Sequence, residues 1–475
     1  MAAIITNKFR VFNAKKFIDA LSASNYYYMF IGRPESWPDD LVPPIPADNV
    51  KQDNKIWDSM IAMKRITSND VSHGIYRRTW TAGKYYDMYR HDYDGTVAGV
   101  NIDTGSSTYP LSMSDANYYV VTANNSLYIC LKTNGQSTVS PQSLGTGGAQ
   151  YLPVTGADGY VWKYIGTTDS TAVNRFQSTY YHPVKTLAAA PLTGDPYEVQ
   201  WNAQQTARTT YPGAIFNVLV TGQGTGYVQG TPPSVTVEGD GTGALAVALV
   251  DGTGKVVGIN MTAYGTGYTW AKIVIAAPSA GTTATATAII TPKDGLGSDP
   301  VRDLNGYFVI AYSAFVEAEG AGDFPVTNDY RQIGIIANPI ENGGTTLLAL
   351  PTASSCYAIK LNPYAGSFSA DSIITEQDGA KGRIIDSYVS GPDLVVRYIR
   401  TETEQVGAGA SSSFNVGKTV ATSSLGTGTI TTVLDKTNGG PEVEKYSGQI
   451  IYYENRRAIQ RSADQTEVII TTFEF

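Results

Sequence analysis

Cysteine and histidine are scarce in this chain of 475 residues. The two cysteines, Cys130 and Cys356, lie too far apart to form a metal knuckle or a redox pair, and their spacing leaves a disulfide undecided. None of the three histidines, His73, His91 and His182, lies at a metal-ligand spacing from another histidine or a cysteine. We therefore expect reduced thiols, no metal site and no cofactor.

Charged residues are also few: Asp, Glu, Lys and Arg make up 16% of the chain, against roughly 25% in an average soluble domain. The net charge is -8 and the pI is about 5.1. Because neutralising phosphates requires a concentrated basic surface, this balance argues against a sequence-independent nucleic-acid binder. No run of like charge suggests a polybasic patch for membranes.

Long apolar runs are missing as well. Residues 1–10 lack the charged-then-apolar order of a signal peptide, so we expect the protein to stay in the cytosol where it is made. The longest uncharged stretch, 273–292, contains Pro278 and Gly281 and alternates Ala with Thr, which is typical of strands. The sequence therefore predicts no membrane span.

Glycine and tyrosine, in contrast, are abundant, with 48 and 32 residues. Glycine supplies the positive φ angles of turns, and Tyr, Thr and Val suit pleated strands. At roughly 150 residues per domain, the length predicts two to four domains. We expect a mainly β, multi-domain protein with a β-sandwich-like core, few short helices and two inserted small β modules containing internal repeats.

Local patterns place the elements. Helical spacing occurs at 14–23 and 54–65, whereas the prolines of 32–46 exclude a helix there and predict an ordered loop. Asn124-Asn125 is suited to a hairpin turn, because Asn tolerates left-handed backbone geometry. The strand candidates are 118–123, 126–131, 160–165 and 307–316.

Two segments repeat themselves. Residues 218–227 recur 41 residues later at 259–268, ending in Gly-Thr-Gly-Tyr both times. Residues 368–374 recur 46 residues later at 414–420. A unit of three or four short strands buries no face alone, whereas two stacked units do. The predicted domains are the first part of the core at 1–204, an inserted module at 205–293, the second part of the core at 294–345, another inserted module at 346–442 and the C-terminal strands of the core at 443–475.

Candidates for catalysis are weak. His91, between Arg90 and Asp92, has the chemistry of a general base, but a surface histidine in a charged loop is far commoner. Glu317 and Glu319 fall on one strand face and imitate a glycosidase pair, although a solvated strand end is the commoner explanation. The sequence therefore predicts no catalytic, cofactor-binding or metal-binding residues, and no enzyme.

Other motifs also have structural explanations. Gly417-Lys418-Thr419 lacks the first glycine of a phosphate-binding loop, and the glycines at 222, 224 and 226 lead into a turn rather than a helix. The tyrosine clusters at 26–28, 85–86 and 452–453 would place one ring inward and one at an interface.

Several motifs together resemble a known family. In chain order they are Gly32-Arg33 with Trp37, Pro43-Pro44-Ile45-Pro46 with Asp48, Arg77-Arg78-Thr79-Trp80, Asp158-Gly159-Tyr160-Val161-Trp162-Lys163-Tyr164, Tyr330-Arg331-Gln332-Ile333 with Asn338-Pro339, and the segment 447–456 with 464–467. Their colinear order is similar to that of the baseplate wedge proteins of T-even-type contractile-tailed bacteriophages, the gene-product-eight family. The resemblance covers about 4–200, 300–343 and 445–475.

The chain departs from that family in two places. The modules at about 205–293 and 346–442 have no counterpart in the T-even member, and Arg457-Ala458 stands where the family tends to have prolines.

The resemblance implies a mainly β structural subunit that forms a homodimer and joins other wedge proteins. It also implies a place in the tail baseplate of the virion, after synthesis and assembly in the host cytoplasm. The acidic charge balance and the lack of a basic run predict no nucleic-acid or membrane partner. Two alternatives stay open: a receptor-binding tail protein, and a depolymerase acting on surface polysaccharide. Host-cell binding by the isolated chain would favour the first, and polysaccharide cleavage the second.

Overall fold

The computed structural model describes residues 3–21, 25–145, 151–316, 329–401, 413–458 and 466–475. Strands dominate these residues, so the prediction of a mainly β protein with few short helices is confirmed. The described α-helices are α1 (Asn7–Leu21), α2 (Val50–Ser59), α3 (Ser170–Phe176), α4 (Glu198–Thr209) and α5 (Pro300–Asp303). Within the described ranges, none of them has the length and apolar character needed to cross a bilayer.

The chain forms two compact units. The first comprises Met1–Lys15, Ser72–Ile310 and Thr472–Phe475, and the second comprises Lys16–Val71 and Ala311–Thr471. One four-stranded sheet, in the order β10-β3-β17-β27, is formed by Tyr181–Val184, Val71–Tyr76, Phe308–Val316 and Thr466–Glu474.

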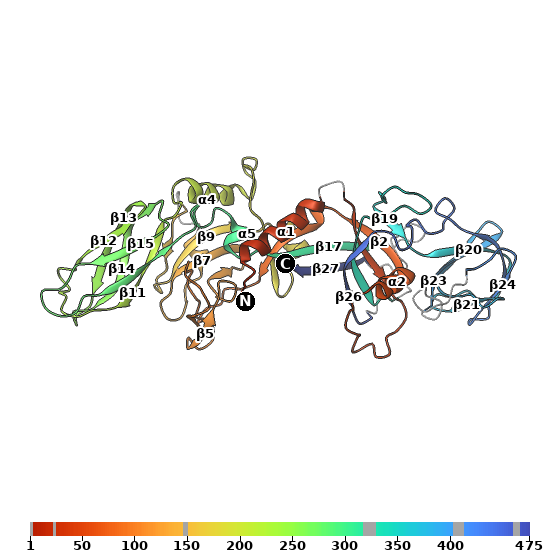
Figure 1. The fold of residues 1–475 in the computed structure, drawn as a ribbon, viewed down its shortest axis with the longest axis horizontal. Helices are drawn as coiled ribbons and strands as arrows, with labels where there is room; N and C mark the ends of the chain where they lie inside the picture. The colour runs from red at the N-terminus through yellow and green to blue at the C-terminus, as the bar shows by residue number, and fades with distance from the viewer. Residues whose placement is uncertain (1–2, 22–24, 146–150, 317–328, 402–412, 459–465) are drawn as a thin grey trace. The chain divides into compact units, whose positions relative to one another are not determined.

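Three other sheets lie wholly within the first unit. One has the order β6-β7-β9-β8 and is formed by Tyr119–Val121, Ser126–Lys132, Val161–Thr167 and Val154–Thr155. A two-stranded sheet pairs β4 (Val97–Val100) with β5 (Ser107–Leu111). The third, seen in green in Figure 1, has the order β15-β12-β13-β14-β11-β16 and is formed by Ala271–Ile275, Ser234–Gly239, Thr242–Val250, Val256–Thr266, Ile215–Gly222 and Thr285–Ile290.

The six-stranded sheet has a core of its own. Ile215 and Val218 of β11 pack there with Tyr227, Ile259 and Tyr268. Because successive side chains of a strand point to opposite faces, the residue after Ile215 on β11 packs into a different cluster.

That different cluster belongs to the β6-β7-β9-β8 sheet. Phe216 of β11 and Ile289 of β16 are buried beside Ile129, Leu131 and Ile165. The segment 205–293 therefore has a private core and also shares the core of its neighbour.

The second unit contains a five-stranded sheet and a closed barrel. The sheet has the order β19-β2-β1-β18-β26 and is formed by Thr352–Ser354, Met60–Ile66, Tyr27–Gly32, Gln332–Ala337 and Gln449–Asn455. The barrel has the order β20-β23-β22-β21-β24-β25 and is formed by Tyr357–Ala365, Asp393–Arg400, Lys381–Ser390, Ile373–Glu376, Thr419–Thr422 and Thr427–Val433. Ile359, Val396 and Ile430 lie in the barrel's own buried cluster.

In each module, some of the segments that resemble each other in sequence are direct neighbours. In the first, β11 pairs with β14 at Val218↔Ile259, and β12 pairs with β15 over the whole of the shorter strand. In the barrel, β21 pairs with β24 from Ile374↔Thr422 to Glu376↔Val420. The duplications and the domain boundaries themselves stay predictions.

One predicted helix is wrong in its second half. Helix α2 ends at Ser59, and Met60–Ile66 forms strand β2 instead. The helical stripe extended past this point because Met60, Ile61 and Met63 are all buried, which a strand covered on both faces also requires. Pairing with β1, from Tyr27↔Ile66 to Gly32↔Met60, decides the conformation.

The remaining local predictions hold. The four strand candidates correspond to β6, β7, β9 and β17, and the segment 14–21 lies in α1. Asn125 has a φ of 61° in the turn between β6 and β7. The proline-rich segment after Gly32 contains no helix or strand before α2.

Candidate functional site

The three histidines are all engaged in the fold of the first unit. His73 Nδ1 lies 3.0 Å from the Gly306 carbonyl oxygen. His91 Nδ1 accepts a hydrogen bond of 3.3 Å from the Ile290 amide, and burial lowers its pKa. His182 is fully buried. His73 is half-buried, whereas His91 is exposed in the charged loop between Arg90 and Asp92, as the surface-histidine explanation predicted.

His182 has a defined proton arrangement. Thr168 Oγ1 donates to the Pro183 carbonyl at 3.0 Å, so it accepts the 2.9 Å hydrogen bond from His182 Nε2. The other ring nitrogen, Nδ1, is buried and has no hydrogen-bond partner. Burial lowers the pKa of His182 to about 4, with a smaller effect from the Arg77 charge. The ring is therefore neutral at pH 7.

Other sequence candidates also take structural roles. Gly417 N donates to the Ile430 carbonyl at 2.8 Å, Lys418 pairs with Asp378 at 2.8 Å, and Thr419 begins β24. This is a turn into a strand and not a phosphate loop. Glu317 and Glu319 lie outside the described residues. Cys130 and Cys356 are free thiols, and burial raises the pKa of both.

The glycines at 222, 224 and 226 belong to strand β11 and the turn that follows it. Gly224 and Gly226 have φ angles of 62° and 86° in this turn. Among the described residues, no group of three or more His, Cys, Asp or Glu side chains is arranged to hold a metal ion.

The tyrosine clusters divide as expected in two cases. Tyr28 and Tyr86 are buried, whereas Tyr27 and Tyr85 are partly exposed. In the third cluster both Tyr452 and Tyr453 are half-buried. Tyr453 donates to the Ala47 carbonyl at 2.7 Å and so belongs to the site described next.

Arg331 is the centre of a site built from the family-like motifs of the second unit. Its guanidinium binds both carboxylate oxygens of Asp40 at 2.9 Å and donates to the Pro34 carbonyl at 2.6 Å. Its backbone amide donates to the Gly32 and Arg33 carbonyls at 3.0 Å. A planar guanidinium suits this geometry, because its donors form a rigid fork. Residues 34–49, the proline loop, are thereby tied to strand β18.

The start of the proline loop has a specific backbone. A side chain at Gly32 would approach the Ser59 carbonyl oxygen to 2.9 Å, so a glycine is needed there. Arg33 has a φ of 55°, and its guanidinium lies 3.7 Å above the Trp37 ring. Trp37 Nε1 in turn donates to the Arg456 carbonyl at 3.0 Å. The Gly-Arg and Trp motifs therefore act together.

The far end of the proline loop is anchored to β26. Asn455 Nδ2 donates to the Pro44 carbonyl at 2.8 Å, and the Ala47 amide donates to the Tyr453 hydroxyl at 2.6 Å. Between these anchors the loop presents apolar side chains to solvent: Ile45 is 92% exposed, and Leu41 and Val42 are also exposed. A fixed loop with an exposed apolar tip is the geometry of a protein-binding element.

Motifs of the first unit form a second internal joint. Asp158 Oδ2 accepts hydrogen bonds from the amides of Thr138 and Val139 at 2.8 and 2.9 Å. Trp80 Nε1 donates to Ser137 Oγ at 3.1 Å. The Trp162 ring, which is buried, stacks on Tyr160 at 5.7 Å. These motif residues therefore hold loops and a core together.

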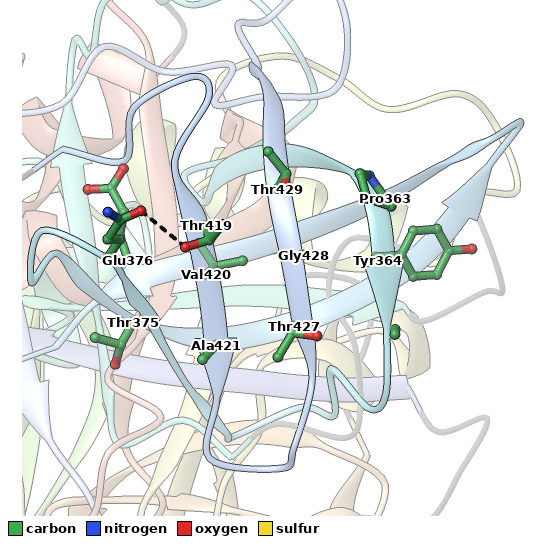
Figure 2. Close-up of a pocket in the computed structure, with 12 residues that line it drawn as sticks. Pro363, Tyr364, Thr375, Glu376, Thr419, Val420, Ala421, Thr427, Gly428 and Thr429 are labelled. Carbon is green, nitrogen blue, oxygen red and sulfur yellow. Dashed lines mark hydrogen bonds between the residues drawn. The ribbon is translucent and has the colours of Figure 1, made fainter.

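The barrel of the second unit adds a groove of about 550 Å³. Figure 2 shows its lining on the neighbouring strands β20, β21, β24 and β25. The lining residues are Pro363, Tyr364, Ala365, Thr375, Glu376, Gln377, Thr419, Val420, Ala421, Thr427, Gly428 and Thr429. Sequence reasoning missed this groove, because the position of Thr side chains on a curved sheet depends on strand pairing that no local pattern shows.

Comparison with known proteins bears on the proline loop directly. Residues 3–123 match the family model of bacteriophage T4 Gp8. This range contains the proline loop and the Arg77–Trp80 motif, so the resemblance stated from the sequence motifs is confirmed. Arg331 and the β26 anchors lie outside the matched range.

A curated relative extends the comparison. The baseplate wedge protein gp8 of Enterobacteria phage T4 is 26% identical to this chain over 203 residues. The alignment covers 38% of this chain and 59% of the relative. The chain therefore spans less than two thirds of the relative's length.

Proposed function

We propose that this chain is a structural subunit of the baseplate wedge of a contractile-tailed bacteriophage, resident in the virion tail and acting by assembly with other wedge proteins. The observation that carries the proposal is the family match over residues 3–123, which contain the proline loop. The T4 relative is named as a baseplate wedge protein.

The proline loop supports an assembly role. Its apolar tip is exposed while its base is held by Arg331 and Asn455, so little conformational entropy remains to be lost when a partner covers it. Strand β13 supplies another exposed apolar row, Leu245, Val247 and Leu249. Contiguous exposed apolar side chains typically mark protein interfaces.

A role without catalysis is part of the proposal. In the described part of the chain, the histidines and buried cysteines are enclosed in cores or held by backbone groups. A catalytic site requires a nucleophile, a base and an orienting group that converge on an open cavity. Purified protein is expected to leave host surface polysaccharide uncleaved, and release of reducing ends would contradict this part.

The protein is further proposed to form a homodimer. Light scattering on the purified chain is expected to give close to twice 50.9 kDa. A monomer that persists at micromolar concentration would contradict the dimer without affecting the wedge assignment.

Assembly can be tested in the phage itself. Phage with a stop codon in this gene are expected to lack normal baseplates in electron micrographs, and the wild-type gene supplied in the host should restore them. The variant Ile45→Asp should fail to restore baseplates, because it places a charge at the loop tip. Leu192→Asp is the matched control, since Leu192 is also exposed but lies outside the proline loop. Normal baseplates in the stop-codon phage would overturn the proposed function.

A further inference from the structure

The groove of the barrel has a wall of alternating residues. The outward positions pair across strands as Thr375↔Ala421, Ala421↔Thr427 and Thr419↔Thr429. The intervening residues Glu376 and Val420 are buried. Four threonine hydroxyls thus line the open face, as Figure 2 shows. Each hydroxyl both donates and accepts hydrogen bonds.

The residues at the two ends of the groove are of other types than the threonines of its wall. Gln377 lies beyond Thr375 on the same chain segment, and its Oε1 accepts a 3.2 Å hydrogen bond from Thr419 Oγ1. Tyr364 and Pro363 lie on β20 at the opposite side, where Tyr364 pairs with Gly428. The groove therefore combines hydroxyls with an amide, while the ring of Tyr364 packs, partly buried, against the barrel core.

The lining disfavours two classes of ligand. None of the described lining residues is Lys, Arg or His, so a phosphate or other anion would lack a countercharge. The one carboxylate, Glu376, is buried and accepts a 2.5 Å hydrogen bond from the Asn415 amide. The lining contains no Leu, Ile, Met, Phe or Trp side chain to anchor an apolar peptide.

Two strands of the barrel, β22 and β25, occupy equivalent positions in the repeat, and the uncharged threonine wall occurs on β25 but not on β22. The Ile384 amide donates to the Ser372 carbonyl at 2.9 Å, and the Ile430 amide donates to the Lys418 carbonyl at 2.9 Å. Donor and acceptor of the second bond each lie 46 residues after those of the first. In that shared register, Lys381 and Arg383 occupy the positions that Thr427 and Thr429 hold in the groove.

The charged side is used by the protein itself. Arg383 pairs with Asp371 at 3.3 Å and lies 3.7 Å from Glu35. The strand carrying Thr427 and Thr429 has neutral side chains at those positions, and they line an open groove of about 550 Å³. This volume lies within the roughly 300–1,000 Å³ of small-ligand sites.

We propose that this groove binds a neutral oligosaccharide. Sugars present hydroxyls that both donate and accept hydrogen bonds and so complement a wall of threonine hydroxyls and a glutamine amide. Because a single buried carboxylate cannot form the carboxylate pair of a glycosidase, the site binds saccharide without cleaving it. This inference is independent of the wedge assignment.

The test uses the full chain and a panel of neutral trisaccharides: maltotriose, cellotriose, chitotriose and galactotriose. Saturation-transfer NMR and calorimetry are expected to show binding of at least one of them. The variant Thr419→Val/Thr429→Val should weaken that binding by about tenfold, or roughly 1.4 kcal/mol, because it removes two hydroxyls while keeping side-chain shape. Ala421→Trp, which fills the centre of the groove, should abolish binding.

The matched control is Thr236→Val/Thr262→Val, which alters two exposed threonines on strands of the other module. It should bind like the wild type. Absence of binding to every trisaccharide, or binding that survives Ala421→Trp in a protein with an unchanged circular dichroism spectrum, would overturn the proposal. Binding of sialyllactose in preference to all neutral sugars would also overturn it.

Discussion

His182 shows how burial of one ring makes stability depend on pH. Its pKa falls from 6.5 in the unfolded chain to about 4 in the folded protein. Between these values the unfolded state binds the proton first, so stability is full above pH 6.5 and is lost as the pH falls toward 4. The loss should approach about 3 kcal/mol, at roughly 1.4 kcal/mol per pKa unit.

Urea unfolding of the wild type and of His182→Gln, each at pH 7 and pH 4.5, measures this loss. The variant should show a smaller decrease, because glutamine does not titrate. An equal decrease in the two proteins would assign the acid sensitivity to other groups.

Arg331 concentrates several hydrogen bonds in a side chain that is only 5% exposed. Lysine cannot reproduce its two-pronged contact with Asp40, so Arg331→Lys should lower the free energy of unfolding by about 2 kcal/mol. The same variant should release the proline loop, and limited proteolysis should cut within 34–49. Arg457→Lys is the control, because Arg457 is exposed. Equal resistance of both variants to protease would contradict the anchoring role.

At the scale of elements, the sequence predicted the strands better than the end of a helix. Strands β6, β7, β9 and β17 were found from Tyr- and Val-rich runs with turn residues at their ends. The Asn54–Arg65 pattern failed because strand β2, covered on both faces, buries consecutive residues as a helical stripe also does. Only pairing with β1, distant in the sequence, separates the two possibilities.

The turns of the six-stranded module depend on glycine. Gly226 has a φ of 86°, and a side chain there would lie 1.6 Å from the Ala280 carbonyl oxygen. Gly226→Ala should therefore lower the free energy of unfolding by at least about 2 kcal/mol, from left-handed strain and steric overlap together. Gly230→Ala is the matched control, since its Cβ would meet nothing within 4 Å. Thermal unfolding of the two variants measures the difference, and equal stabilities would contradict it.

At the scale of the whole molecule, the sequence indicated which motifs belong together but not why. Gly32 and Arg331 are nearly 300 residues apart, and the hydrogen bond from the Arg331 amide to the Gly32 carbonyl follows only from the pairing of β1 with β18. The groove could not be predicted at all, because its threonines come from strands that meet only when the barrel closes.

Strands β11 and β16 contribute to the neighbouring core, so a deletion of the first module should preserve that core only if it keeps both strands. Replacing 223–284 by Asn-Gly keeps Phe216 and Ile289 in the neighbouring core and joins strands already paired at Gly222↔Thr285. This protein should stay soluble and unfold cooperatively, although Ile215 and Val218 lose their partners in the module's private core. Replacing 207–291 by a Gly/Ser linker also removes Phe216 and Ile289, so it should expose Leu131 and Ile165 and bind more hydrophobic dye. Equal dye binding by the two proteins would show that the shared core is dispensable.

The close pairing of β11 with β14 and of β12 with β15 has a further consequence for concentrated protein. Each half of the module completes the other, and the connection between them is the short turn from Asp251 to Lys255, closed by Asp251 Oδ1 accepting from the Thr253 and Lys255 amides at 2.9 and 3.0 Å. If this hinge cannot fold back, two molecules can exchange halves and bury the same surfaces. Deleting residues 252–254 should therefore link the proposed homodimers into larger, domain-swapped oligomers, and size-exclusion chromatography should show these oligomers increasing with protein concentration during refolding. A deletion variant whose oligomeric state matches the wild type at every concentration would show that the turn does not control this exchange.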